Sequence, residues 1–249
     1  MSAPILNLAA YRFVPLDDLP ALRQRLFDAA AQAGLKGTVL LAGEGLNLCL
    51  AGPSDAARQW LADLHADARF ARLQPKESWS VAQPFKRLKV KIKAEIIRMN
   101  QPAVRPLSLL PAQRAPAVTA TTLARWIGQG HDDTGRPLAL LDTRNGFEVD
   151  AGAFEGALDW RLNKFSDFPA ALAAHADALR DHTVVSYCTG GIRCEKAALV
   201  MQAQGLAHSY QLEGGILKYF EDTAGQAPGW RGRCFVFDAR AGLDTRLSA

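Results

Sequence analysis

The stretch VVSYCTGGIRCEKAALV, residues Val184–Val200, joins an apolar run to a glycine-containing turn and a helix-like segment. The run predicts a buried strand over residues 182–188, and the segment after the turn predicts a helix that ends at Gly205. In parallel sheets, active sites gather beyond the carboxyl ends of the strands. Cys188 occupies such an end, so the stretch bears on both the fold and the function.

Other segments of the back half repeat this alternation of strands and helices. Residues 121–130 predict a helix, residues 137–144 a buried strand and residues 208–215 a further strand. Strands that alternate with helices indicate a parallel sheet with helices on both faces. The back half is therefore predicted to be an α/β domain.

The front half has a different order of elements. Strands are predicted over 5–14, 37–45, 46–52 and 85–99, and helices over 17–34 and 54–70. This β-α-β-β-α-β order predicts an α+β, ferredoxin-like sandwich, with an antiparallel sheet and both helices on one face.

Proline separates the two halves, with four prolines between residues 100 and 118. Proline removes backbone donors and restricts the residue before it, which favours an extended linker. The predicted organisation is a ferredoxin-like domain over 1–99, a linker over 100–117, an α/β domain over 118–230 and a C-terminal tail over 231–249.

The composition is that of an ordinary globular protein. Of the 249 residues, 49% are hydrophobic and 22% are charged, and no apolar run approaches the roughly 20 residues that span a bilayer. The N-terminus lacks the features of a secretory signal. Four cysteines and five histidines show no metal-ligand or disulfide spacing. These features predict a cytoplasmic protein with free thiols, no metal and no evident cofactor.

The net charge of +4 is unevenly distributed. Residues 1–117 hold 16 Lys and Arg against 9 Asp and Glu, a net charge of +7, whereas residues 118–249 hold 13 against 16, a net charge of −3. A basic front half suggests an anionic partner, although many basic surfaces only maintain solubility.

Within the front half, Arg87, Lys89, Lys91 and Lys93 alternate with apolar residues in the last predicted strand. Alternation places the four cations on one face of the strand, where they could meet successive phosphates of an RNA. The pattern equally fits a solvated sheet face or an edge strand protected by lysines. Both interpretations remain open at this stage.

The turn after Cys188 has the features of an anion cradle. A glycine-containing turn before a helix can direct backbone amides at one point, and the N-terminus of the helix adds positive charge there. A cysteine at the rim of such a turn has a lowered pKa, and Arg193 adds a fixed charge. A buried structural cysteine is the alternative, but the combined features favour an activated sulfur nucleophile.

Two blocks, LLDTRNGFEVDAGAFEGALDW and VVSYCTGGIRCEKAA, resemble the rhodanese domain. The resemblance implies that Cys188 accepts a sulfane sulfur as a persulfide, with Asp142 and Arg144 as supporting residues. It makes Thr189, Gly190, Gly191, Ile192 and Arg193 the active-site loop. Cysteine-dependent phosphatases place five residues between cysteine and arginine, whereas four intervene here, which makes a phosphatase the lesser alternative.

Further motifs along the chain, VLLAGEGLN, FKRLKVKIKAEI, LEGGILKYF and WRGRCFVFDAR, are similar to the rhodanese-containing tRNA uridine hydroxylases. That resemblance implies an acylphosphatase-like front domain, tRNA as partner and oxygen-dependent hydroxylation at carbon 5 of the wobble uridine. It also marks the chain as a short member without the cysteine-rich C-terminal segment. The alternatives are a sulfurtransferase that uses a sulfur donor and a non-catalytic, RNA-binding sulfur carrier.

Overall fold

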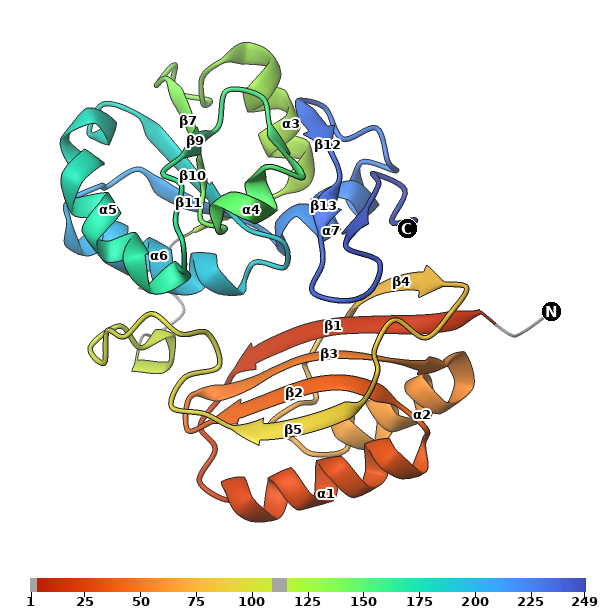
Figure 1. The fold of residues 1–249 in the computed structure, drawn as a ribbon. Coiled ribbons are helices and arrows are strands. Elements are labelled where there is room, and N and C mark those ends of the chain that lie inside the picture. The colour runs from red at the N-terminus through yellow and green to blue at the C-terminus, as the bar shows by residue number, and fades with distance from the viewer. Residues whose placement is uncertain (1–3, 109–115) are drawn as a thin grey trace. The chain divides into compact units, whose positions relative to one another are not determined.

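A computed structural model describes residues 4–108 and 116–249, which form two compact units (Figure 1). The first unit contains residues 4–98, 237–240 and 248–249, and the second contains the described residues of 99–236 together with 241–247. Seven of the residues in the predicted linker, 109–115, lie outside the described residues. No helix within 4–108 or 116–249 has the length and hydrophobicity needed to cross a membrane.

The first unit is a five-stranded sheet with two helices on one face (Figure 1). Strand order is β4-β1-β3-β2-β5, and all neighbours are antiparallel except β2 and β5. The elements are β1 Ile5–Phe13, α1 Leu19–Gln32, β2 Lys36–Ala42, β3 Gly45–Pro53, α2 Ser54–His65, β4 Lys76–Ser80 and β5 Leu88–Ile92.

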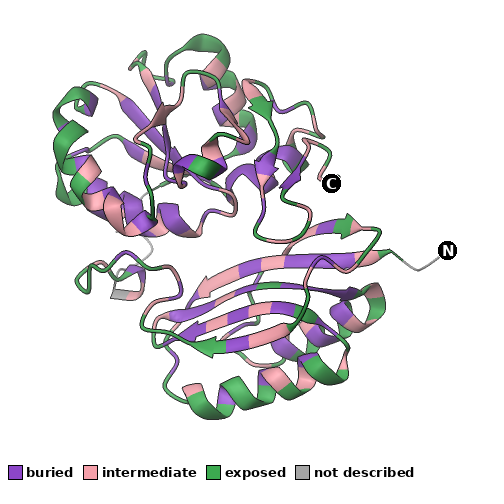
Figure 2. Cartoon of the chain, in the orientation of Figure 1, coloured by how far each residue is buried: buried purple, intermediate pink, exposed green. Residues whose placement is uncertain are grey.

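The core of this unit lies between the sheet and the helices. Alternate residues of β1, β2 and β3 are buried against one side of each helix, as the coloring of the strands in Figure 2 shows. Trp60 of α2 and Leu26 of α1 contribute to this cluster and are almost fully buried. The predicted α+β sandwich is therefore confirmed.

The last strand of the sandwich differs from the prediction. The strand that lies beside β1 at one edge of the sheet is β4, residues 76–80, which was not predicted. The basic segment forms a fifth strand, β5, at the opposite edge and runs parallel to β2. The sequence of β4, KESWS, contains one large apolar residue and no apolar alternation, so it did not predict a strand. That residue, Trp79, is 44% exposed in the structure. Strand β5 spans five residues rather than fifteen.

The second unit is built on a parallel sheet of order β6-β11-β10-β7-β9. Helices α5 and α6 cover one face, and α3 and α7 cover the other (Figure 1). This arrangement confirms the predicted α/β domain. Its strands are β6 Ala117–Val118, β7 Leu138–Asp142, β9 Leu158–Asp159, β10 Thr183–Tyr187 and β11 Ser209–Leu212, and its main helices are α3 Ala120–Gln129, α5 Phe168–His175, α6 Ile192–Ala203 and α7 Gly215–Asp222.

Short elements complete the second unit. Helix α4, Gly146–Val149, follows β7, and the strand β8, Gly152–Phe154, pairs with β12, Trp230–Gly232. Strands β13, Cys234–Phe235, and β14, Gly242–Leu243, pair with each other. Six residues of the segment predicted as a tail, 231–232, 234–235 and 242–243, are thus paired in strands. Residues 237–240, between β13 and β14, belong to the first unit, and within that unit Arg240 Nη1 donates to Ser78 Oγ at 2.8 Å.

Candidate active site

Cys188 directly follows β10, and α6 begins four residues later at Ile192. The turn between them depends on Gly191, whose φ of 94° lies in the left-handed region that favours glycine. This conformation directs the Gly191 amide back toward the cysteine, where it donates to Cys188 Sγ at 3.2 Å. The predicted loop therefore forms a concave turn around the sulfur.

The Cys188 thiol is buried as well as activated. Only 1% of the residue is exposed, so the sulfur is buried within the turn and does not lie at an exposed rim. Burial by itself raises the pKa of Cys188. A hydrogen bond from Cys194, the charge of Arg193 and the amides of Arg193 and Gly191 outweigh burial and lower that pKa to about 6. The sulfur is therefore largely a thiolate at neutral pH.

Cys194 and Thr143 lie behind the reactive sulfur. Cys194 is fully buried, and its Sγ lies 3.8 Å from Thr143 Oγ1. Burial and the neighbouring Cys188 sulfur raise the pKa of Cys194 well above its usual value. Of these two adjacent thiols, Cys194 thus stays protonated and can donate its hydrogen to Cys188.

Arg193 is held in the first turn of α6 by Glu148 of α4. Nη2 of Arg193 donates to Glu148 Oε1 at 2.9 Å, and Glu148 Oε2 accepts from the Asn145 amide at 3.0 Å. Nη1 of Arg193 is buried and has no hydrogen-bond acceptor within the described part of the chain. The guanidinium is thus held on one side and retains unused donors on the other.

Glu148 did not figure among the predicted site residues. A signal for it existed in the spacing of Asn145 and Glu148, which form the capping box of α4. That spacing predicts a helix start but not a partner for Arg193, which lies 45 residues further along the chain. The contact depends on the alignment of β7 beside β10.

Asp142 and Arg144 form a buried ion pair at the end of β7. Nη2 of Arg144 lies 2.6 Å from Asp142 Oδ2, and both side chains are 0% exposed. The same guanidinium donates to the carbonyl of Gly152 at 2.7 Å and to that of Glu148 at 3.3 Å. These contacts support the segment that carries Glu148, so the ion pair affects the Cys188 loop indirectly, through the position of Glu148.

The start of α7 supports the loop from its other side. The amides of Ile216 and Leu217 donate to the carbonyls of Cys188 and Thr189 at 3.0 and 3.1 Å. This approach requires Gly215, because a Cβ there would lie 2.4 Å from the Cys188 carbonyl oxygen, and its φ is 71°. Gly215 is a second residue that sequence reasoning did not place at the site.

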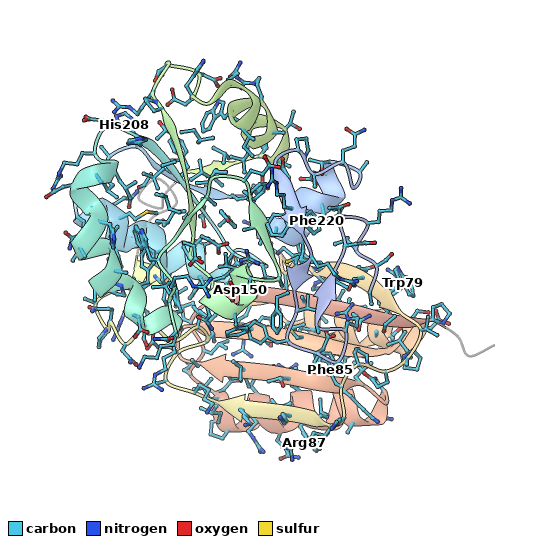
Figure 3. The ribbon with its side chains drawn as sticks, turned by 45° about the horizontal axis from the view of Figure 1, so that its top comes forward. Trp79, Phe85, Arg87, Asp150, His208 and Phe220 are labelled. Atoms are coloured by element: carbon cyan, nitrogen blue, oxygen red, sulfur yellow. The ribbon has the colours of Figure 1, made fainter. Side chains whose placement is uncertain are left out.

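The predicted RNA-binding cations lie in the first unit. Lys89 and Lys91 belong to β5, whereas Arg87 and Lys93 flank it, and β5 pairs only with β2, which leaves its outer edge unpaired in the described sheet. Figure 3 labels Arg87 at the periphery of this unit. None of the four forms an ion pair with the described residues. A track of uncompensated positive charge therefore follows this edge.

No group of three or more His, Cys, Asp or Glu side chains that could hold a metal ion occurs in 4–108 and 116–249. The site described above is built from a thiolate, backbone amides and one guanidinium.

Two family models match the chain. Residues 5–96 match a model described as a UPF0176 acylphosphatase like domain, and residues 119–222 match the rhodanese-like domain. Among curated proteins, a tRNA uridine(34) hydroxylase of Variovorax paradoxus is 59% identical over 245 residues, which is 98% of this chain and 91% of the relative.

The chain belongs to the tRNA uridine(34) hydroxylase family. Relatives of that name from Bordetella petrii and Bordetella avium are 59% and 57% identical, and each match covers 98% of this chain. The matches cover 94% and 98% of those relatives. Membership confirms the resemblance seen in the rhodanese and front-half motifs.

Proposed function

We propose that this protein hydroxylates carbon 5 of the wobble uridine, position 34, of tRNA in the cytoplasm, with molecular oxygen as the oxidant. The observation that carries the proposal is the match over 98% of the chain to relatives named tRNA uridine(34) hydroxylase. Cys188 is the residue on which the reaction depends in this proposal, because it is the thiol of the site with a pKa lowered to about 6.

The geometry of the loop supports a role for Cys188 as a sulfur acceptor. Its thiolate would attack the outer sulfur of a sulfane donor, form the S–S bond and release the rest of the donor as an anion. The resulting persulfide is negatively charged. The Gly191 amide and the charge of Arg193 lie where they can stabilise that anion. The identity of the donor is left open by the proposal.

The positive edge of the first unit supports tRNA as the substrate. Each phosphate that Arg87, Lys89, Lys91 or Lys93 neutralises releases a counterion and strengthens binding. Alternate residues of a strand are about 6 to 7 Å apart, which is similar to the spacing of phosphates along an RNA strand. The proposal assigns these four residues to contacts with the tRNA backbone.

The test is the modification profile of tRNA in a host that lacks other routes to 5-hydroxyuridine. Nucleoside mass spectrometry should detect 5-hydroxyuridine derivatives when the wild-type protein is expressed and only background with Cys188→Ser. Cys49→Ser is the matched control, because it replaces a free cysteine in β3 of the first unit, which does not contribute to the site. A profile that is the same with and without the wild-type protein would overturn the proposal.

The sulfurtransferase alternative makes a different prediction. Under it, the purified protein turns over thiosulfate in the presence of cyanide and Cys188→Ala abolishes the turnover, while the tRNA profile does not change. Under the carrier alternative, neither activity is found, although tRNA still binds.

A further inference from the structure

Strand β5 lies at an edge of the first unit's sheet, and its backbone groups alternate in direction. The Gly37 amide of β2 donates to the Arg87 carbonyl at 3.1 Å, and the Lys93 amide donates to the Leu41 carbonyl of β2 at 2.7 Å. Bonds from a strand to one parallel neighbour fall on every second residue, which here leaves out Val90. The Val90 carbonyl therefore points away from β2, at the unpaired edge of the described sheet.

Arg23 of α1 occupies this outer edge. Its Nε donates to the Val90 carbonyl at 3.1 Å, although the two residues are 67 positions apart in the sequence. Edge strands present unpaired carbonyls and amides, and natural proteins often cover them. Covering the edge of β5 is therefore one role that the contact gives to Arg23.

The guanidinium of Arg23 also retains donors that this contact does not use. Arginine carries N–H groups on all three of its nitrogens in a rigid planar fork, and the bond to Val90 takes only the one on Nε. Arg23 is exposed and forms no ion pair with residues 4–108 or 116–249. The N–H groups on Nη1 and Nη2 thus remain available on a side chain whose position is already fixed.

Two lysines flank the point at which Arg23 meets β5. Lys89 and Lys91 precede and follow Val90, and Val90 belongs to the core between the sheet and the helices. Alternation therefore places both lysines on the opposite face of the strand, about 7 Å apart. Neither lysine forms an ion pair within the described ranges. Helix α1 thus adds a third cation beside these two, which the sequence of β5 alone does not reveal.

We infer that Arg23 binds a phosphate of the tRNA and completes the basic track of β5 from the side of α1. This inference rests on the proposed function and extends it, since it adds a residue of α1 to the contacts with the tRNA backbone. A guanidinium forms paired hydrogen bonds with two oxygens of one phosphate. Because the Val90 carbonyl already orders the side chain, less conformational entropy is lost when the phosphate binds.

The experiment measures the affinity of the full-length protein for a transcribed tRNA with uridine at position 34 over a range of salt concentrations. Arg23→Gln removes the charge, but its amide nitrogen occupies the place of Nε and can still donate to the Val90 carbonyl. It should reduce the slope of log affinity against log salt by about 0.7 to 0.9, the value for one phosphate contact. Arg23→Lys keeps the charge without the fork, so it should retain the slope and bind more weakly than wild type.

Arg25→Gln is the matched control. Arg25 lies on the same helix and is exposed, but its Nη2 is 2.7 Å from Asp67 Oδ2. The substitution changes the net charge by the same amount, so it separates one bound phosphate from overall charge, and it should leave the slope unchanged. The Tm of Arg23→Gln should equal that of wild type, because the glutamine amide still covers the edge of β5.

The outcomes separate this inference from the proposed function. If Arg23→Gln retains the wild-type slope, the inference is overturned, whether or not tRNA is hydroxylated. A lowered Tm with an unchanged slope would assign Arg23 to the cover of β5 alone, which also overturns it. Equal loss of slope in Arg23→Gln and Arg25→Gln would do the same, since only overall charge would then matter. If Arg23→Gln alone reduces the slope but the tRNA profile never changes, the inference stands and the proposed hydroxylation fails.

Discussion

Glu148 and Arg193 form a buried ion pair in which Oε1 lies 2.9 Å from Nη2, and this pair orients the one guanidinium beside the Cys188 sulfur. The Glu148 side chain is 0% exposed and that of Arg193 is 9% exposed, so water weakens their attraction little. The carboxylate therefore both positions the arginine and offsets part of the charge that the thiolate experiences.

The pH dependence of thiol reactivity should follow the lowered pKa of Cys188. In wild type, the rate of alkylation by iodoacetamide should rise through about pH 6 and level off above neutrality, since the pKa is lowered to about 6. In Arg193→Gln the midpoint should move up toward the ordinary thiol value of about 8.5, because the stabilising charge is lost. Arg193→Lys, which keeps a charge, should shift the midpoint less. Cys188→Ser supplies the background from the other cysteines, and a wild-type midpoint near 8.5 would contradict the assignment.

Glu148→Gln should lower both the free energy of unfolding of the protein and the pKa of the Cys188 thiol. Without the carboxylate, the buried charge of Arg193 loses its hydrogen-bonded partner and keeps only the Cys188 thiolate as a counter-charge, which should lower the free energy of unfolding by about 3 to 5 kcal/mol. Because Glu148 no longer offsets the charge of Arg193, the alkylation midpoint of Cys188 should move below that of wild type. Urea unfolding and the alkylation profile measure the two effects. Glu155→Gln, which removes an exposed partner of Arg231, should alter neither. A midpoint that rises in Glu148→Gln would show that orientation of Arg193 outweighs its charge.

Gly215→Ala should disturb the loop more than its backbone strain accounts for. Gly156 has the same φ of 71° but open space around the position of a Cβ, so Gly156→Ala reports the strain alone, about 1 to 2 kcal/mol. At Gly215 the added Cβ would also lie 2.4 Å from the Cys188 carbonyl oxygen and 2.6 Å from the Gly191 nitrogen. We expect a larger loss of unfolding free energy and slower alkylation of Cys188 in Gly215→Ala. Equal behaviour of the two variants would mean that the loop can move away without cost.

The cations around β5 should account for part of the salt dependence of tRNA binding. Replacement of Arg87, Lys89, Lys91 and Lys93 by Ala should reduce the slope of log affinity against log salt by about 3, because each lost phosphate contact removes about 0.7 to 0.9. The matched control removes four cations that already pair with carboxylates, namely Arg58, Arg125, Arg180 and Lys218. It changes the net charge equally but should leave the slope nearly unchanged. Similar slopes for both quadruple variants would indicate that only overall charge matters.

The sequence predicted most of the architecture because the relevant signals are local. Apolar runs marked β7 and β10, and a glycine marked the end of α6, whose last helical residue is Ala203, two before Gly205. The missed strand β4 shows the limit of this approach. Its residues KESWS carry no alternation, and the strand exists because it can pair along β1. Pairing with a partner distant in sequence replaced the missing local preference.

The sequence alone determined the reactive turn, since a strand, two glycines, an arginine and a helix follow one another within seventeen residues around Cys188. Only the tertiary structure decided how deeply the sulfur is buried and which residues surround the turn. Glu148 lies 45 residues before Arg193 in the sequence, and Gly215 lies at the start of α7. Their contacts with the turn depend on the parallel register of β7, β10 and β11. A carboxylate that meets a guanidinium, and a glycine that admits a carbonyl, are properties of distances between elements, and such distances are set only when the sheet has formed.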